Sequence, residues 1–339
     1  MAKSKSYRDI IRDIRQGKLH AVYFLAGEED FFTKKIENAL LEHVVAEEAK
    51  GFDQAVYYAQ DVSLQDLLMR ASQFPMMGER QLLVVRNAEN YFKNAKDLEA
   101  IKQYVSHLPS QTVLSLRYHG KPGAKIKKAL SGEGVLYYES PRIYDNQIPG
   151  FIEDLLKYHG FSADTKAVYM LSEHVGSDLS RMEKEIEKLS VVLESGTKIT
   201  PDIVEKYIGI SKDFNIFEFK SAIAQGDFAR AYKIARFFSQ NPKEYSLYAI
   251  VAVLYGFFAQ LYKYWTLPDK HDRSRVASAL KINPYFVPEY QKAARYYPMK
   301  KISKVMQVLR DTDLKVKGLG AGRAEYKDLI NEMIYKIMH

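Results

Sequence analysis

Two segments of this sequence place residues where nucleotide chemistry would need them, and each follows a short apolar run. The run Val22-Tyr-Phe-Leu-Ala26 ends at Gly27, the position of a loop that binds phosphate. The run Leu82-Leu-Val-Val85 ends at Arg86-Asn87, where a nucleotide hydrolase commonly has an Asp-Glu pair for magnesium and water. A guanidinium has no lone pair and an amide carries no charge, so Arg86 and Asn87 cannot hold a divalent cation.

The loop after Gly27 does not match a phosphate-binding motif when it is tested residue by residue. After four free positions the Walker motif needs glycine, lysine and then serine or threonine, and this sequence has Phe32, Thr33 and Lys34 there. The acidic residues 28–30 put negative charge where backbone N–H groups would surround a phosphate, so repulsion opposes nucleotide binding. The ordinary alternative is that these acids favour a helix N-terminus. We therefore expect no cofactor, no catalytic residue and a degenerate nucleotide site, not expected to bind, at Gly27, Thr33, Lys34, Arg86 and Asn87.

A third segment, residues 74–78, places apolar side chains in a turn ahead of the second apolar run. Pro75 and Gly78 flank Met76 and Met77, which favours a turn that ends the preceding helix and lets the two side chains project. Apolar residues are usually buried, however. The residues alone therefore favour the interpretation that Phe74, Met76 and Met77 are core side chains between a helix and a strand.

No group of residues has the spacing of a metal site. The eight histidines are scattered, with no pair at the spacing of helical metal ligands, and the sequence has no cysteine. We therefore expect no metal, and we interpret the histidines as surface or interface residues. The stretch Gly318-Leu-Gly-Ala-Gly322 follows a predicted helix instead of a strand, which indicates a turn and not a dinucleotide-binding loop.

Short apolar runs alternate with helical patterns over the first 145 residues, which is typical of a parallel sheet covered by helices on both faces. A run that is apolar throughout indicates a strand buried on both faces. The predicted strands are 22–26, 82–85, 112–117 and 134–138, and the predicted helices between them are 32–44, 63–72 and 97–107.

Helical patterns alone continue from residue 146, and a polar segment at 209–215 divides them. The helices expected before this segment are 148–158, 164–174, 178–193 and one that opens at Pro201. Those expected after it are 216–224, 227–239, 245–265, 274–280, 284–294, 299–315 and 324–338. We therefore predict an α/β domain over 1–145, a small helical domain over 146–211 and an all-helical domain over 212–339.

The composition is that of an ordinary globular protein, with 47% hydrophobic and 27% charged residues in a chain of 339. The absence of cysteine excludes thiol catalysis and disulfides, and it favours the cytoplasm. The basic N-terminus is not followed by the apolar segment of a signal peptide, and the longest apolar candidate, Ala249 to Leu261, has the length of a buried helix. We therefore expect no membrane contact.

The net charge of +8 is unevenly distributed along the chain. Residues 212–339 contain 22 Lys and Arg against 12 Asp and Glu, while residues 1–211 contain 28 against 30. A basic C-terminal third favours a nearby nucleic acid, although a basic face opposite an acidic partner subunit would have the same composition.

Four segments in order carry a resemblance to a known family. They are Val22-Tyr-Phe-Leu-Ala-Gly-Glu-Glu29, Arg80-Gln-Leu-Leu-Val-Val-Arg-Asn-Ala88, Gly176-Ser-Asp-Leu-Ser-Arg-Met-Glu-Lys-Glu-Ile-Glu-Lys-Leu189 and Phe217-Glu-Phe-Lys-Ser-Ala-Ile-Ala-Gln-Gly-Asp-Phe-Ala-Arg-Ala231. They resemble the opening strand, the second-strand signature, the lid helix and the start of the collar in the delta-subunit family of the bacterial DNA polymerase III clamp loader. The resemblance implies an AAA+-like α/β domain with a degenerate nucleotide site, a helical lid domain and a helical collar domain for oligomerisation.

The resemblance also implies a role for the turn at residues 74–78. In the family, the residues just before the arginine of the second-strand signature form a hydrophobic wedge, which enters a pocket on the ring-shaped sliding clamp and helps to open it. By position this wedge is Met76 and Met77, with Phe74 beside them. The family usually has Leu-Phe or Phe-Phe at the tip. Met-Met departs from that pattern, because a thioether fills an apolar pocket but loses more rotamer entropy than a ring.

The function implied is that of a non-catalytic subunit, which binds and opens the sliding clamp for loading onto primed DNA during replication while neighbouring subunits of the polymerase III assembly supply ATP hydrolysis. The expected partners are the sliding clamp, the ATPase and other loader subunits, and primed DNA through the complex. The possible phosphate contacts are Lys300, Lys301, Lys304, Lys315, Lys317 and Arg323. The alternatives are an active AAA+-like ATPase or helicase loader with an unorthodox loop, and a single-strand binding protein that stacks bases on its 25 Tyr and 17 Phe.

Overall fold

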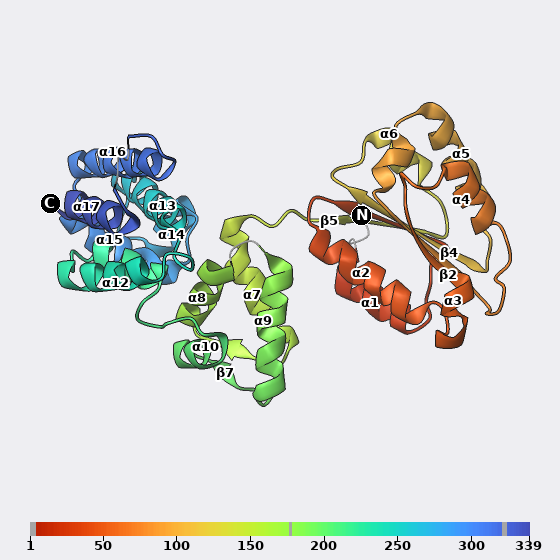
Figure 1. Ribbon diagram of the computed structural model, residues 1–339, viewed down its shortest axis with the longest axis horizontal. Helices are drawn as coiled ribbons and strands as arrows, with labels where there is room; N and C mark the ends of the chain where they lie inside the picture. Colours follow the sequence, from red (N-terminus) through yellow and green to blue (C-terminus); the bar gives the residue numbers. More distant parts are fainter. Residues whose placement is uncertain (1–4, 176–177, 321–323) are drawn as a thin grey trace. The chain divides into compact units, whose positions relative to one another are not determined.

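The structure is a computed structural model that describes residues 5–175, 178–320 and 324–339 (Figure 1). The chain forms two compact units, one ending at Ile143 and one beginning at Tyr144. The second unit contains the helices expected at 146–211 together with those expected at 212–339. The division of the chain into three domains therefore stays a prediction.

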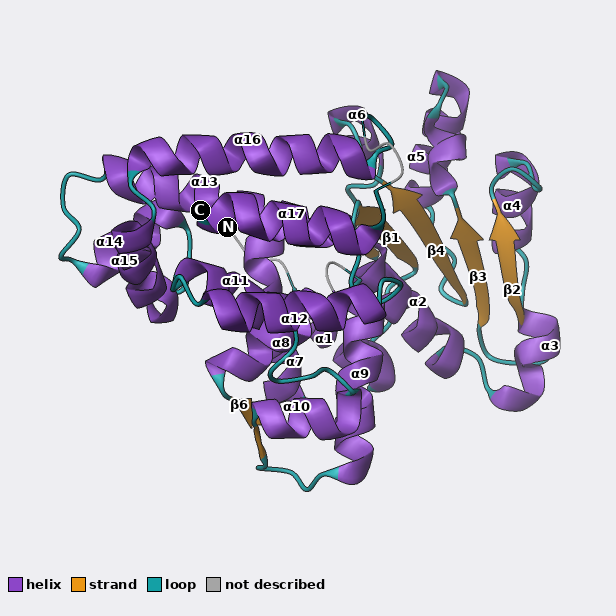
Figure 2. Cartoon of the chain, turned by 60° about the vertical axis from the view of Figure 1, so that its left-hand side comes forward, coloured by secondary structure: helices purple, strands orange, loops and turns teal. Residues whose placement is uncertain are grey.

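The first unit is built on a five-stranded parallel sheet with the strand order β2-β3-β4-β1-β5 (Figure 2). The strands are β1 (Val22–Gly27), β2 (Gln54–Tyr58), β3 (Gln81–Arg86), β4 (Thr112–His119) and β5 (Val135–Ser140). The helices of this unit are α1 (Tyr7–Arg15), α2 (Asp30–His43), α3 (Lys50–Asp53), α4 (Leu64–Ala71), α5 (Ala95–Ser106) and α6 (Ala124–Ala129), with short 3-10 turns at Glu47–Ala49 and Ala88–Phe92. This confirms the predicted helix-covered parallel sheet.

The central strands are apolar along their whole length because helices cover both faces of the sheet. Alternate residues such as Phe24, Leu83 and Leu114 join a core that includes residues of α4, α5 and α6. Helix α2 packs against β1, β3, β4 and β5, and its Ile36 and Leu40 are fully buried. The end of β1 and the end of β3 therefore lie near the N-terminal half of α2.

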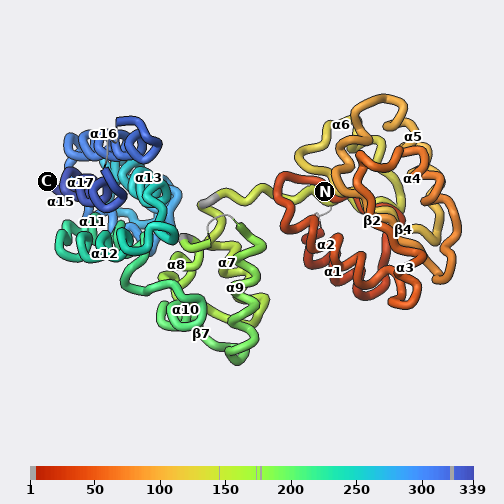
Figure 3. The backbone as a smooth tube through the Cα atoms, in the orientation of Figure 1, coloured from red at the N-terminus to blue at the C-terminus, as the bar shows by residue number. Residues whose placement is uncertain are grey.

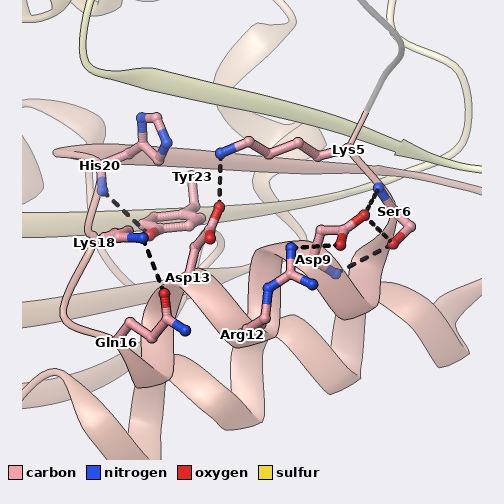
Figure 4. Close-up of polar contacts among 9 residues, drawn as sticks. All are labelled: Lys5, Ser6, Asp9, Arg12, Asp13, Gln16, Lys18, His20 and Tyr23. Atoms are coloured by element: carbon pink, nitrogen blue, oxygen red, sulfur yellow. Dashed lines mark hydrogen bonds and ion pairs between the residues drawn. The ribbon is translucent and has the colours of Figure 1, made fainter.

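Strand β2 and helix α1 were not predicted from the sequence. As an edge strand β2 pairs with β3 only, and none of its residues is fully buried, so it lacks a continuous apolar run. Helix α1 buries only Ile10 and Ile14. Most of its other residues are charged, so the sequence of this helix shows no clear apolar periodicity. The N-terminus of α1 is fixed by a capping box between Ser6 and Asp9 (Figure 4).

The second unit begins with helices α7 (Ile148–Tyr158), α8 (Thr165–Val175), α9 (Leu179–Val192) and α10 (Pro201–Ile208), which were predicted within one or two residues. Two short strands, β6 (Ser162–Ala163) and β7 (Lys198–Ile199), pair in parallel beside them. The expectation that this region contains helices alone is therefore wrong in one detail. Two-residue strands have no periodicity that a sequence pattern could reveal.

The remaining helices form a bundle around α13 (Leu247–Thr266). Its other members are α11 (Ile216–Ala224), α12 (Phe228–Gln240), α14 (Arg273–Leu280), α15 (Val287–Tyr296), α16 (Met299–Val316) and α17 (Tyr326–Met338), with a 3-10 turn at Pro284–Phe286. Figure 3 follows the backbone from α10 through residues 209–215 into α11. The all-helical character predicted for this part of the chain is confirmed.

Among the described residues, α13 is the one helix that is long and apolar enough to cross a membrane by length and composition. The expectation that no segment has the length of a membrane span is therefore wrong for this helix. It packs against α11, α15 and α16, and residues such as Leu254 and Phe258 are fully buried, which is the position of a core helix. Its buried residues recur every three or four positions, which places them along one side of the helix.

Helix α8 is joined to the bundle by two sets of contacts within the second unit. The buried carboxylate of Glu218 on α11 forms ion pairs with Lys166 of α8 and Arg230 of α12. The ring of Tyr169 on α8 lies edge-on to Phe286, with 4.4 Å between the ring centroids. These contacts place the helices expected on either side of residue 212 in one compact unit.

Candidate functional site

The turn after β1 is closed by backbone contacts of its own chain. Gly27 has φ of 129° and exchanges two backbone hydrogen bonds with Gly120, at 3.1 and 2.9 Å. A Cβ atom on Gly27 would lie 1.9 Å from Oγ of Ser140 and 2.8 Å from its backbone nitrogen, so only glycine fits there. The N–H group of Gly27 is therefore already used, and Ser140 occupies the adjacent space.

The N-terminus of α2, where a phosphate would bind in a nucleotide site, is capped by the chain itself. Glu29 accepts a hydrogen bond from the N–H of Phe31 at 3.0 Å. Lys34 pairs with Asp30 at 3.2 Å, and the buried hydroxyl of Thr33 donates to the carbonyl of Asp30 at 3.1 Å. Carboxylates thus take the positive end of the helix that an anionic ligand would otherwise use.

The end of β3 carries an ion-pair cluster in place of acidic metal ligands. Arg86 contacts Oε1 of Glu37 through Nε at 2.9 Å and through a terminal nitrogen at 2.7 Å. Arg117 at the end of β4 approaches Oε2 of the same carboxylate at 3.5 Å. Glu37 is buried on α2, and Tyr58 of β2 accepts a hydrogen bond from Arg86 at 3.4 Å. Hydrogen bonding to Tyr58 and the pairing with Glu37 raise the pKa of Arg86.

The backbone after β3 turns sharply at Asn87, which adopts the left-handed conformation with φ of 57° and ψ of 40°. Asparagine tolerates this conformation better than most residues, which gives Asn87 a structural role. Among the residues that the structure describes, no group of three or more His, Cys, Asp or Glu side chains is placed to hold a metal ion.

The loop between α4 and β3 exposes the apolar residues that the sequence singled out. Phe74 is 81% exposed, Met76 is 76% exposed and Met77 is 62% exposed. The interpretation of these residues as core side chains is therefore wrong. Three large apolar side chains exposed within four positions form a patch of the kind that marks a protein-binding surface. We call residues 74–78 the apolar loop.

A buried carboxylate that the sequence analysis missed holds the apolar loop. Asp53, at the end of α3, accepts hydrogen bonds from the backbone N–H groups of Met76, Met77 and Gly78. The bond from Met77 is 3.0 Å long and the bond from Gly78 is 2.6 Å long. No motif signals this contact, because Asp53 lies more than twenty positions before the loop.

The helix before the apolar loop is fixed by a second buried polar group. The side-chain amide of Gln81 donates to the carbonyl of Gln73 at 2.6 Å and to the hydroxyl of Thr112 at 3.0 Å. That hydroxyl donates in turn to the carbonyl of Ala71 at 2.8 Å. The carbonyl of Ala71, at the end of α4, is thereby satisfied from β4, and Gln81 of β3 holds the carbonyl of Gln73 just beyond the helix.

The candidate phosphate contacts lie on or just after α16, except for Arg323, which is outside the described residues. Lys300 and Lys304 are exposed and lie one turn apart. Lys301 donates to the carbonyl of Met338 at 2.8 Å. Two further lysines are in ion pairs within the bundle, Lys315 with Glu332 and Lys317 with Asp313.

The fold and these contacts define a class of protein, an AAA+-like chain in which Ser140 lies against Gly27 and the end of β3 carries the Arg86–Glu37 ion pair. That its nucleotide site is degenerate stays a prediction. Residues 23–133 match the family described as DNA polymerase III, delta subunit, and residues 213–337 match the C-terminal domain of the same subunit. The chain is 25% identical over 321 residues to DNA polymerase III subunit delta of Bacillus subtilis (strain 168), with 91% of both chains covered.

A solved structure, that of the Bacillus subtilis DNA clamp loader delta protein, has the same fold. The TM-score is 0.61 at 23% sequence identity, and the match covers 98% of this chain and 99% of that one. The chain therefore belongs to the family of DNA polymerase III delta subunits, the clamp-loader subunits.

Proposed function

We propose that this chain binds the sliding clamp through Phe74, Met76 and Met77 and helps to open it for loading onto primed DNA. The observation that carries the proposal is the exposure of these three side chains on a loop whose backbone is held by hydrogen bonds. An apolar tip on a fixed loop fits a preformed apolar pocket, because the backbone of the loop loses little conformational entropy on binding.

The opening step follows from differential affinity. Burial of a methionine side chain contributes about 1.5 to 3 kcal/mol relative to leaving it exposed. If the apolar loop makes more of this contact with a distorted ring than with a closed ring, binding shifts the ring toward the open form by the difference. The chain needs no nucleotide of its own for this step.

The energy for the loading cycle then comes from partner subunits that hydrolyse ATP. The contacts of Gly27, Glu29 and Arg86 support this division of labour, because they use the groups that would otherwise bind phosphate and metal. The helical bundle of residues 216–338 is the proposed site of assembly with those subunits. The complex acts on DNA in the cytoplasm.

The test is a titration of the cognate sliding clamp against the chain and against Met76→Ala/Met77→Ala. We expect the double variant to bind about 30- to 1,000-fold more weakly, because roughly 2 to 4 kcal/mol of apolar contact is lost. A ring-opening assay on the clamp, with fluorophores across one of its interfaces, should show a matching loss of opening.

The matched control is Val191→Ala/Val192→Ala. These two residues, at the end of α9, are 84% and 53% exposed, so the variant removes exposed apolar surface from the second unit and leaves the apolar loop intact. Its affinity for the clamp should equal that of the unchanged chain. Equal clamp binding by the Met76→Ala/Met77→Ala variant would disprove the proposed function.

A further inference from the structure

Asp53 is a buried acid whose partners all lie in the apolar loop. Its side chain is 4% exposed, and it stands at the junction of α3 and β2, next to the point where the loop enters β3. Figure 2 shows α3 at the end of the sheet where β2 and β3 begin. One carboxylate oxygen accepts from Met76, and the other accepts from Met77 and Gly78.

The three bonds are of the strong, charge-assisted kind because the acceptor is ionised. Burial raises the pKa of Asp53, but the three amide groups of Gly78, Met76 and Met77 oppose that effect, and the net result is a lowered pKa. Among the described residues, no Lys, Arg or His pairs with this carboxylate. Its charge is therefore balanced mainly by the backbone of the apolar loop.

The close fit around Gly78 shows how tightly the loop is drawn to the carboxylate. A Cβ atom on Gly78 would lie 3.3 Å from Oδ2 of Asp53 and 3.4 Å from Cβ of Ala49. Gln81 fixes the other side of the loop through the carbonyl of Gln73. The backbone of residues 76–78 is thus held from two sides while the methionine side chains stay exposed.

We propose that Asp53 is a positioning residue, which fixes the backbone of residues 76–78 so that Met76 and Met77 project before any partner arrives. This proposal rests on the proposed function, because the expected consequence of a fixed loop is tighter binding of the clamp. Fixing the loop in advance removes the entropy cost of ordering its backbone on contact with the partner.

The test uses Asp53→Asn in the whole chain of 339 residues. An asparagine keeps the shape but has one acceptor oxygen, and its NH2 group faces loop N–H groups that also donate. We expect Asp53→Asn to weaken clamp binding by about tenfold, the effect of ordering roughly one residue on contact. Asn94→Ala is the matched control, because it removes the side-chain acceptor of a backbone N–H at the start of α5, away from the loop. Its clamp affinity should not change.

A structural effect is separated from a positioning effect by combining variants. In the Met76→Ala/Met77→Ala background the methionine side chains are gone, so we expect Asp53→Asn to change clamp affinity by less than about twofold. The same loss in both backgrounds would show that Asp53 acts on binding without the methionines, and it would overturn the proposal.

Hydrogen exchange measures the loop directly, without the clamp. In chain labelled with 15N-methionine, which gives signals from few of the 339 residues, the amides of Met76 and Met77 should be protected. Asp53→Asn should remove that protection, while Met182, which is buried and whose amide donates to the carbonyl of Asp178 in the first turn of α9, stays protected and shows that the fold is intact. Protection that persists at Met76 and Met77 would also overturn the proposal.

These readouts keep the two proposals distinguishable. If Met76→Ala/Met77→Ala binds the clamp as tightly as the unchanged chain, the proposed function fails. The exchange experiment still decides whether Asp53 holds the loop, because it needs no partner.

Discussion

Glu37 is the residue on which the closed nucleotide site depends. Its buried carboxylate joins α2 to the ends of β3 and β4 through Arg86 and Arg117. Arg86 lies at the strand end where a metal site would need acids, and Arg117 lies near the end of the neighbouring strand. The negative charge of Glu37 lies on the helix that would carry the phosphate-binding lysine. The polarity of the site is therefore the reverse of what Mg-ATP requires.

At this scale we predict that restoring the acidic pair does not restore nucleotide binding. Arg86→Asp/Asn87→Glu supplies carboxylates, but Gly27 remains bonded to Gly120, and Glu29 still caps α2. Neither the unchanged chain nor the variant should bind Mg-ATP in a calorimetric titration. The variant should also be less stable, by about 3 kcal/mol, because Glu37 loses its main cationic partner while buried.

A clamp-loader ATPase subunit, titrated in the same way, shows that the assay detects binding. Lys102→Asp is the control for stability, since it breaks a solvent-exposed ion pair with Glu99 on α5 of the same unit. Exposed pairs contribute about 1 kcal/mol or less, so its effect should be small. Saturable micromolar binding of ATP to the unchanged chain would favour the alternative of an active ATPase.

A site residue can be predicted from the sequence when its role depends on its position at the end of a strand. It is missed when its role depends on a contact with a residue that is distant in the sequence. Arg86 and Asn87 were recognised because they end an apolar run. Glu37 is 49 positions from Arg86, and it looks like any acid on a helix. Asp53 and Ser140 were missed for the same reason, because only the folded chain brings them to the apolar loop and to Gly27.

At the scale of helices and strands, the sequence predicts the elements that have a continuous buried face, because their apolar residues form a clear pattern. Strands β1, β3, β4 and β5 were found, while β2, at the edge of the sheet with a half-exposed face, was not. The apolar loop lies between the elements that fix it, because Gln81 of β3 holds the end of α4 and Asp53 of α3 holds the loop backbone. The exposure of its side chains therefore depends on three elements that hold its backbone, namely α3, α4 and β3.

The connection from α1 to β1 gives a pH-dependent contribution to stability. The backbone N–H of His20 donates to the hydroxyl oxygen of Tyr23 at 3.2 Å. The imidazole ring of His20 lies edge-on to the ring of Tyr23, and Lys5 and Asp13 lie nearby (Figure 4). Burial lowers the pKa of His20, and the charge of Lys5 lowers it further, while Asp13 opposes this. The folded chain therefore favours the neutral imidazole.

The unfolded chain protonates His20 near its ordinary pKa of about 6.5, above the pKa in the folded chain. Between these two values the unfolded state binds more protons, so stability is fully present above about pH 6.5 and falls as the pH decreases. Thermal unfolding measured from pH 5 to 7.5 should show this decrease, and His20→Gln should make it smaller.

The matched variant for this effect is His174→Gln. Burial and the neighbouring Arg181 lower the pKa of His174 in the second unit. This histidine should therefore also contribute a loss of stability as the pH decreases. The double variant should therefore have the flattest profile. A profile for His20→Gln that superimposes on that of the unchanged chain would show that His20 is not the source of the loss.

At the scale of the whole molecule, the two units carry different kinds of surface. The first contains the closed site and the apolar loop, and the second contains the helical bundle and the basic excess. Both are matched by the delta-subunit family, over residues 23–133 and 213–337. The contacts of Gly27, Glu29 and Arg86 favour the prediction that this chain binds no nucleotide. On that prediction, we expect the chain to act in a loader through its binding surfaces.

The basic surface is best tested at Lys300 and Lys304. Both are exposed near the start of α16, whereas Lys301, Lys315 and Lys317 already have partners within the bundle. Substituting the partnered lysines would disturb the fold and confuse the measurement. Lys300→Ala/Lys304→Ala removes two charges that, among the described residues, hold no ion pair.

If these two lysines contact phosphates, the assembled loader carrying the double variant should bind primed DNA more weakly. The slope of log K against log salt should also decrease in magnitude by roughly 1.8, because each lost phosphate contact on duplex DNA contributes about 0.9.

Lys125→Ala/Lys128→Ala, on exposed positions of α6, removes the same charge from the first unit and controls for net charge alone. A charge effect without contact would lower the affinity equally in both variants, whereas a contact lowers the slope only for Lys300→Ala/Lys304→Ala. Equal slopes in all three proteins would therefore show that Lys300 and Lys304 do not contact phosphate.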